Sequence, residues 1–496
     1  MEGKYLKIIE RLKELSRKGL SSEIHREIKN LVGFKLPRSH RWRLAYLARS
    51  NNLPLLAIQL LHPIVRPEKP LEPPASNQEL AEYASSLFSI GAGKEANKIL
   101  SELDPSQIPQ ALLYRALACF NLWEYQETIP LLNEYIEREP DPYLNTVGKT
   151  KLAAAMIFLG FSEASQLLAE LRSKTKEKDY WLLYGSSLEL SAQISLSSKK
   201  FQESKRLLNE AANVLQKSKN FNDFFVRKWQ AIVDLYQSPE SPQALYNLEK
   251  IKKEGAKYQS WETVRTCDLH IATATKNPAL FAKVYFGTPS PAYRQAIKKK
   301  IPQKWSLPQK YLLTSPHLTT PLWMLDLKLG TEQSGKCQLK PGRLLHQALV
   351  LLIKDFYHPQ QIGALHSELF PHSYFNPISS PNRVYQVISR LRNWINNSGL
   401  PMHIQENHSH YWAQVRSGLS VLIREEDSNT LTPNQTLFDR LQKIGFEEFS
   451  AKQVCHQLGL SRSAFNRFSK WAIEEGLLEK RGQSSSTCYR LISLAA

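Results

Sequence analysis

The sequence predicts a mostly α-helical protein, with an N-terminal solenoid of paired helices followed by two small α+β domains built around a helix-turn-helix. Three observations predict this fold class. Small residues and leucines recur at fixed offsets in the first half of the chain. Two segments of the last third share the order helix, helix, helix, hairpin, and a basic, Pro-rich stretch separates the two regions. A chain of 496 residues is too long for one hydrophobic core, so several domains are expected.

The formal net charge of +19 is distributed unevenly. Residues 1–50 hold 13 basic and 5 acidic residues (+8), whereas residues 51–275 hold 25 and 27 (−2). Residues 276–321 hold eight basic residues and no acidic ones, and the two C-terminal segments, 322–424 and 430–496, add +5 and +3. Basic charge placed in this way neutralises phosphates, although a solubilising surface predicts the same excess.

Neither a secretory leader nor a membrane span is expected. The first twelve residues mix charge with apolar residues, and no later run reaches the roughly 18 apolar residues that a bilayer requires. The five cysteines are far apart in the sequence and form no CxxC pair, which favours free thiols in a reducing compartment over disulfides or a zinc ribbon. We therefore expect a cytoplasmic protein.

Residues 78–286 carry a helical repeat. Ala84, Ala96 and Leu100 have the same offsets as Ala116, Thr128 and Leu132, which lie 32 residues further on. Two later sets continue the pattern: Phe161, Ala164 and Leu168, then Phe201, Ser204 and Leu208. Repeats of this length indicate stacked helix pairs. Residues 1–77 are expected to form a helical cap with Leu6, Ile9, Leu12 and Leu15 on one face, interrupted by five prolines between Pro63 and Pro74.

These repeats resemble the tetratricopeptide family. Leu122, Tyr125 and Thr128 follow its spacing and Glu139-Pro140 closes the second helix, although the Trp and Gly of the consensus are mostly absent. The resemblance implies a concave surface that holds a protein or peptide partner. A spacer or a dimerisation scaffold is the alternative interpretation.

No enzyme motif is present in the sequence. Gly148-Lys149-Thr150 lacks the earlier glycine of a phosphate-binding loop, because Tyr143 occupies that position. Signatures of zinc hydrolases, serine hydrolases and dinucleotide-binding enzymes are also missing. We expect no catalytic residues, no cofactor and no metal.

Residues 287–321 form the predicted basic, Pro-rich linker, and residues 322–424 the first α+β domain. The domain is expected to begin with two short strands around Gly335. Three helices, at 344–356, 360–370 and 382–397, should precede a hairpin made by residues 402–405 and 411–415. In the third helix, one face is apolar; it comprises Val384, Val387, Ile388, Leu391 and Ile395.

This domain resembles the OmpR-like winged helix of bacterial response regulators. The segment Val384-Tyr-Gln-Val-Ile-Ser-Arg-Leu-Arg392 fits the motif of that family's recognition helix, although the hairpin lacks the usual glycines and no receiver domain precedes it. The resemblance implies that the third helix enters the DNA major groove, with Arg383, Gln386 and Arg390 at base edges and Arg392 and Asn393 at phosphates. A solvated polar helix face is the alternative. His403, His408 and His410 have no further ligand at metal-binding spacing.

Residues 430–496 form the second α+β domain. Helices are expected at 437–445, 450–459 and 462–475, the last capped by Ser461 and burying Phe465, Phe468, Ala472 and Ile473. A two-stranded wing around Gly482 follows. The order resembles the broad bacterial winged helix-turn-helix class, which implies a DNA interface consisting of Arg462, Ser463, Asn466, Arg467, Lys470 and Arg481. Winged helices also dock onto proteins, and that alternative stays open here.

The sequence as a whole predicts a sequence-specific, double-stranded DNA-binding transcription regulator whose helical repeats receive a protein or peptide signal. RNA polymerase is a further candidate partner. The rival prediction, from a different class, is a non-enzymatic interaction scaffold in which the repeats and both winged helices dock onto other proteins. Salt dependence separates them, because phosphate binding weakens steeply with salt.

Overall fold

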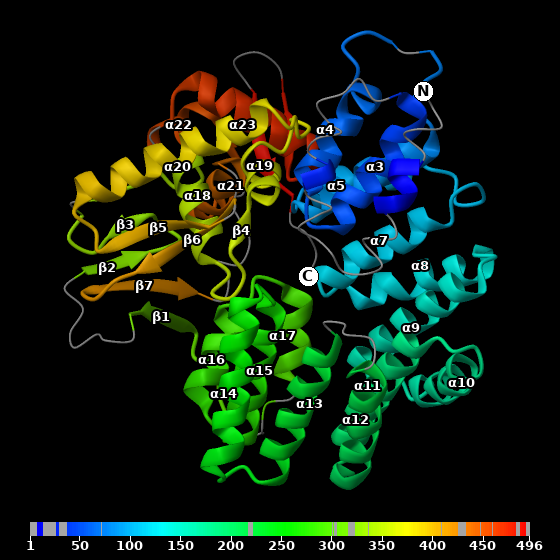
Figure 1. Ribbon diagram of the computed structural model, residues 1–496. Helices are drawn as coiled ribbons and strands as arrows, with labels where there is room; N and C mark the ends of the chain where they lie inside the picture. The colour runs from blue at the N-terminus through cyan, green and yellow to red at the C-terminus, as the bar shows by residue number, and fades with distance from the viewer. Residues whose placement is uncertain are drawn as a thin grey trace. The chain divides into compact units, whose positions relative to one another are not determined.

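The structure is a computed structural model. It describes residues 7–12, 26–28, 37–70, 72–216, 222–299, 301, 305–315, 323–335, 337–407, 409–424, 433–446, 448–458, 460–482 and 487–492. The chain forms two compact units. Figure 1 labels their helices and strands. The first comprises Met1–Pro308, Asp355–Tyr385 and Glu406–Tyr411, and the second comprises Gln309–Lys354, Gln386–Gln405 and Trp412–Ala496. Both units therefore combine segments that are distant in sequence.

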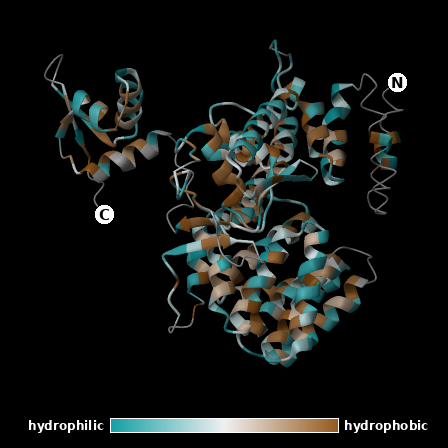
Figure 2. Ribbon diagram, turned by 90° about the vertical axis from the view of Figure 1, so that its left-hand side faces the viewer, coloured by the Kyte–Doolittle hydropathy of each residue, from teal (hydrophilic) through white to brown (hydrophobic). Residues whose placement is uncertain are grey.

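The first unit is built mainly from an array of helices in which each helix packs against the next. Hydrophobic and hydrophilic residues alternate along these helices, as expected for helices that bury one face (Figure 2). Its helices are α3 (Arg38–Ser50), α4 (Pro54–Val65), α5 (Asn77–Ser89), α6 (Gly93–Ser101), α7 (Gln110–Asn121), α8 (Tyr125–Arg138), α9 (Pro142–Leu159), α10 (Ala164–Glu177), α11 (Trp181–Ser197), α12 (Phe201–Gln216), α13 (Asn222–Gln237), α14 (Pro242–Lys257), α15 (Trp261–Ala274), α16 (Pro278–Phe286) and α17 (Pro291–Lys298).

The second helix of each pair carries the repeat that the sequence predicted. A small residue near its start and a leucine four positions later are both buried, so that neighbouring helices approach closely. These pairs are Ala57 and Leu61, Ala96 and Leu100, Thr128 and Leu132, Ala164 and Leu168, Ser204 and Leu208, and Ala244 and Leu248. The prediction of helical repeats is confirmed, and the same pattern continues into α4, before residue 78.

The turns between helices use glycine at some positions and other residues elsewhere. The residue that ends a helix here often has a positive φ, a conformation that glycine adopts most easily. Gly91 and Gly160 occupy two such turns. Non-glycine residues with positive φ occupy the others: Asn52, Trp123, Asp179, Lys199, Gln259 and Lys276.

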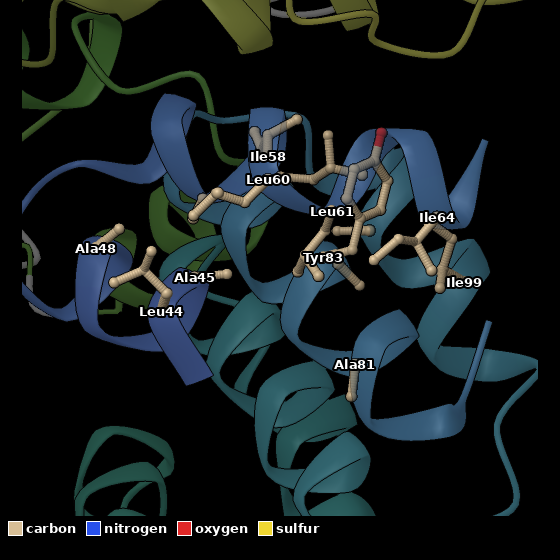
Figure 3. Close-up of a cluster of buried hydrophobic side chains, with 14 of the residues drawn as sticks. Leu44, Ala45, Ala48, Ile58, Leu60, Leu61, Ile64, Ala81, Tyr83 and Ile99 are labelled. Atoms are coloured by element: carbon tan, nitrogen blue, oxygen red, sulfur yellow. The ribbon is translucent and has the colours of Figure 1, made fainter. Parts of the chain in front are cut away.

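A large hydrophobic core lies at the N-terminal end of the array (Figure 3). It joins α3, α4, α5 and α6 through side chains such as Leu44, Leu61 and Tyr83. The prediction that Pro63 begins a break in the helical region is wrong, because Pro63 lies inside α4 and the helix continues to Val65. Only the later prolines lie outside helices, before the Ser76 cap of α5.

The predicted linker contains regular structure. Helix α17 occupies part of it, capped by Ser290, whose hydroxyl accepts a hydrogen bond from the Tyr293 amide. The Tyr293 side chain is buried, and its ring packs 4.3 Å from that of Trp123 between centroids. Strand β1 (Lys310–Thr314) follows. Lys300 and residues 316–322 lie outside the described residues.

The second unit contains a four-stranded sheet with the order β1-β7-β2-β3. Strand β7 (Leu419–Arg424) pairs antiparallel with β1 and parallel with β2 (Trp323–Asp326), which pairs antiparallel with β3 (Thr331–Glu332). Arg424 donates to Asp326 over 2.8 Å and ties β7 to β2. Sequence analysis predicted strands on both sides of Gly335, but both β2 and β3 lie before it; within residues 337–339, Gln338 forms an isolated bridge with Thr331. Strands β1 and β7 were overlooked. Helix α18 (Leu344–Ile353) follows β3 and is almost wholly buried.

Further strands and helices follow α18. Strand β4 (Gln360–Gln361) belongs to a sheet of order β4-β6-β5 with β5 (Met402–Asn407) and β6 (His410–Val415). Helix α19 (Ile362–Leu369) and helix α20 (Ser379–Ser398) lie between β4 and β5 in the chain. The predicted helices and hairpin are therefore present, each with slightly different ends. His408 lies outside the described residues.

The C-terminal residues form their own hydrophobic core, with Phe449, Phe465, Phe468 and Tyr489 among its members. The elements are α21 (Pro433–Ile444), β8 (Glu448–Ser450), α22 (Ala451–Leu458), α23 (Arg462–Glu474), β9 (Leu478–Arg481) and β10 (Cys488–Leu491). The strands form an antiparallel sheet of order β8-β10-β9. Gly459 and residues 483–486, at the predicted helix stop and wing tip, lie outside the described residues.

One predicted core residue of this C-terminal part is wrong. Ile473 is 38% exposed, whereas Ser469 is buried on the same helix. Helix geometry explains the difference. Phe465, Phe468 and Ala472 lie on the buried face of α23; Ser469 lies beside this face, whereas Ile473 lies on the exposed side.

None of the helices in the described part of the chain has the length and hydrophobicity of a membrane span. The same residues contain no group of three or more His, Cys, Asp or Glu side chains that could hold a metal ion. All five cysteines are free thiols.

Candidate nucleic-acid interface

Helix α20 is amphipathic as the sequence predicted. Val384, Val387, Ile388, Leu391 and Ile395 are all at most 3% exposed, and they form one stripe along the helix. Burial of this stripe fixes which way the opposite, polar face points.

The polar face of α20 is a row of amides and arginines. Gln386, Arg390 and Asn393 are exposed and lie on successive turns, and Asn397, which sequence analysis overlooked, extends the row by one more turn. No Asp or Glu occurs anywhere in the helix. The spacing of Asn397, four residues after Asn393, is the signal that could have identified it. This face can donate hydrogen bonds and presents no carboxylate that would repel an anion.

Two other predicted residues of α20 have partners within the protein. The Arg383 guanidinium lies 3.9 Å from the centre of the Phe370 ring and donates to the Ser373 hydroxyl over 3.2 Å. Arg392 donates to the carbonyl of Ile404 over 3.1 Å, a contact between α20 and β5. Both arginines hold the helix to its surroundings, unlike Gln386, Arg390 and Asn393.

Beside Arg383 lies a buried histidine whose ring nitrogens have no hydrogen-bond partner. His366 of α19 is 0% exposed, and neither of its ring nitrogens has a hydrogen bond. Its ring packs among Phe370 and Phe375 instead. Burial, reinforced by the nearby positive charge of Arg383, lowers the pKa of His366 to about 4. The ring is therefore neutral at physiological pH.

Helix α23 carries the second predicted cluster. Ser461 caps the helix by accepting a hydrogen bond from the Ala464 amide over 3.2 Å. Burial of Phe465 and Phe468 against Tyr489 orients the helix. The predicted residues are all exposed on the remaining faces: Arg462, Ser463, Asn466, Arg467 and Lys470. Arg467 and the Ser463 hydroxyl lie 3.4 Å apart, one turn along the helix.

Carboxylates reduce the positive charge elsewhere in this C-terminal part. Arg481 of β9 is held by Glu479 at 2.8 Å and by Glu448 of β8 at 3.4 Å. Lys470 lies 4.0 Å from Glu474. The structure therefore places Arg481 in an ion-pair network, whereas Arg462 and Arg467 lie in the first half of α23, away from Glu474 at its last position.

The helical array has a basic pocket of about 180 Å³ between α10, α11 and α12. Arg172, Lys176 and Arg206 line it, together with Tyr184 and Glu210, which hydrogen bond to each other. Arg206 also pairs with Glu203 at 2.8 Å. The pocket is small enough to hold a single side chain, and its cations favour an acidic one.

No protein-family model matches the sequence, and the comparison with curated proteins gives no match. Among solved structures, the chain is similar to Rap protein in its complex with competence and sporulation factor, with 9% sequence identity and a TM-score of 0.40, covering 60% of this chain and 87% of that one. A similarity this distant assigns no function to the chain.

Proposed function

We propose that the protein is a sequence-specific, double-stranded DNA-binding transcription regulator with a winged helix around α20 and a second one around α23. The polar face of α20 is the observation that carries the proposal. A helix with exposed Gln386, Arg390 and Asn393, and without a single carboxylate, suits the major groove, where each base pair presents its own pattern of hydrogen-bonding groups.

The contacts within the protein refine the roles of the individual residues. Arg390 and Gln386 are the base-reading residues, because an arginine pairs with guanine and a glutamine with adenine through two hydrogen bonds each. Asn393 and Asn397 continue the row toward phosphates. Arg383 and Arg392 stabilise the position of α20 through Phe370 and the Ile404 carbonyl.

Helix α23 contributes a second reading surface in this proposal. Arg462, Asn466 and Arg467 lie exposed near its capped N-terminus, where recognition helices of this type contact bases. Because the two helices belong to one chain, binding of one helix to DNA raises the effective concentration of the other at the same duplex. A protein-docking role has one specific observation in its favour, since Arg481 is neutralised by Glu448 and Glu479.

The helical array is the proposed receiver of a signal. Its basic pocket favours a protein or peptide partner that inserts an Asp or Glu side chain between Arg172, Lys176 and Arg206. RNA polymerase is a candidate for a further partner of the DNA-bound protein.

Selection from random-sequence duplexes tests the DNA-binding proposal. The full-length protein is mixed with the duplex library, and the retained duplexes are sequenced and titrated by fluorescence anisotropy at low and moderate salt. The test variant is Arg390→Ala with Arg467→Ala. The control is Arg172→Ala with Arg206→Ala, which removes the same charge from the array.

A regulator enriches a common sequence, binds it with a steep salt dependence, and loses that binding in the test variant but not in the control. Absence of enrichment and of binding at low salt would contradict the proposal and favour the interaction scaffold. Equal loss of DNA binding in both double variants would show that the protein binds DNA by non-specific charge attraction.

A further inference from the structure

We infer that the helical array is a structural part of the first DNA-reading domain, with Arg265, Asp268 and Glu95 acting as positioning residues for helix α20. This inference rests on the proposed DNA-binding function. Its basis is that residues Asp355–Tyr385, which include α19 and the start of α20, belong to the same compact unit as the array. Two joints hold this segment, and each is made by array residues that lie far away in the sequence.

The first joint lies at α15 and α16. Arg265 is 2% exposed and donates to both carboxylate oxygens of Asp355 at 2.7 and 2.8 Å. Tyr357 donates to Asp268 over 2.9 Å, and the Phe356 amide donates to the carbonyl of Gly287 over 3.0 Å. Removal of one partner from a buried ion pair leaves an uncompensated buried charge, so a substitution at either residue of this joint is costly.

The second joint lies at α4, α5 and α6. Phe375 is 0% exposed and is a member of the N-terminal core, and its backbone amide donates to Glu95 over 2.6 Å. Helix α19 approaches the array so closely that a Cβ on Gly363 would lie 2.4 Å from the carbonyl oxygen of Ile90. A side chain larger than hydrogen does not fit there, so the backbones are in direct contact.

The second joint leads directly to the first residues of α20. Asn376 forms a hydrogen bond with His62 of α4 over 3.2 Å. The side-chain oxygen of Asn376 accepts from the amides of Ile378 and Ser379 at 2.9 and 3.0 Å, just where α20 begins. A side chain that hydrogen bonds to the backbone in this way fixes a turn and a helix start. The residue that fixes the start of α20 is therefore also in contact with the array.

Burial distinguishes a permanent joint from a surface that docks and releases. Arg265, Asp268, Gly363 and Phe375 are all buried, and separation of the joint would expose apolar surface such as the Phe375 ring to water. The array therefore supplies the packing that an independent domain would take from its own residues. We expect DNA reading by α20 to depend on array residues that touch no DNA.

The charge of the joint gives a discriminating experiment. Asp355→Asn removes a negative charge, so electrostatic attraction alone predicts equal or tighter binding to DNA, whereas loss of positioning predicts weaker reading by α20. Glu203→Gln is the matched control, because it makes the same charge change on the exposed surface of α12. Asn376→Ala is a milder second variant that leaves the net charge and the buried ion pair unchanged.

Full-length variants are titrated with the duplex selected by the wild type and with point-substituted copies of it. Hydrogen exchange of residues 355–398 is measured without DNA. We expect Asp355→Asn and Asn376→Ala to accelerate this exchange. Both variants should also discriminate about tenfold less between base pairs at the positions read by α20, with unchanged discrimination at the positions read by α23. Glu203→Gln should match the wild type.

Unchanged exchange in both variants would overturn the inference, whether or not the protein binds DNA. Faster exchange with unchanged discrimination would also overturn it, because the joint would then be irrelevant to reading. Equal loss of discrimination at the base pairs read by α20 and by α23 would also overturn it, because the substitutions would then destabilise the whole protein and not α20 in particular. If the wild type binds no duplex and exchange is nevertheless faster in both variants, the proposed function is contradicted and the joint has a structural role alone.

Discussion

The two predicted DNA-reading helices are supported in different ways. Helix α20 starts from a segment that packs against the array. In this segment, Phe375 belongs to the N-terminal core and Asp355 forms an ion pair with Arg265 of the array. Helix α23 packs within a core made only by residues of the C-terminal part, around Phe465 and Tyr489. The two helices therefore have similar patterns of apolar and polar residues, but α20 follows a segment that packs against the array, whereas α23 packs within a core of the C-terminal part.

This difference separates the two requirements for reading DNA. The exposed residues of a recognition helix decide which bases it contacts, and the residues beneath it decide whether it is held in place. For α23 both sets are local. For α20, the segment that precedes the helix is held by residues of α4, α6 and α15.

Truncation of one aromatic core residue on each side gives the largest expected effect. Phe375→Ala and Phe465→Ala each remove a ring that is 0% exposed and should each cost about 3–5 kcal/mol. Phe375→Ala should increase hydrogen exchange in both residues 355–385 and the array helices α4–α6. Phe465→Ala should increase it only in residues 433–492.

If Phe375→Ala loosened residues 355–385 alone, the segment would not share a core with the array, and the comparison above would fail. Spread of the Phe465→Ala effect into α4–α6 would equally contradict the independence of the C-terminal part.

His366, on the array-supported side, predicts an effect of pH on stability. Its folded-state pKa of about 4 lies below the ordinary value of 6.5, so the unfolded chain binds the proton first as pH falls. The folded state should lose roughly 3 kcal/mol between pH 6.5 and pH 4, and the loss should begin below pH 6.5. Thermal melting of wild type and His366→Leu across this range measures it.

The His366→Leu protein should keep more of its stability at low pH and should also gain at neutral pH, because two unsatisfied buried nitrogens disappear. The same pH slope in wild type and variant would exclude His366 as the cause.

Local patterns predicted much of this molecule. The helical spacing of Val384, Ile388 and Leu391 gave the buried face of α20, and the Ser461 cap gave the start of α23. The joint between Arg265 and Asp355 could not be predicted, because the two residues are 90 positions apart and neither has an unusual neighbourhood in the sequence. Strand β7 was overlooked although its apolar run, Leu419–Ile423, was visible; its partner β1 lies more than 100 residues earlier.

Alanine substitution of the reading arginines should have intermediate effects. Arg390→Ala and Arg467→Ala should each weaken binding to the selected duplex by about 1–3 kcal/mol and relax specificity at different base pairs. Arg206→Ala, on the exposed surface of the array, is the control for loss of one positive charge. Relaxed specificity at the same base pair in both variants would show that the two helices do not read separate positions.

The smallest expected effect comes from releasing Arg481. Glu479→Gln removes the closer of its two carboxylates, at 2.8 Å, and leaves Glu448 in place. Exposed ion pairs of this kind are worth at most about 1 kcal/mol, so DNA binding should strengthen by a few-fold at most and the salt dependence should become steeper. Weaker binding would favour protein docking by the C-terminal part.

Hydrogen exchange of the full-length protein with and without its selected duplex tests the central claim most directly. The account predicts that DNA protects two separate segments, residues 386–398 of α20 and residues 462–470 of α23, while the pocket helices α10–α12 are unchanged. Protection confined to the array, or no protection at α20, would contradict it.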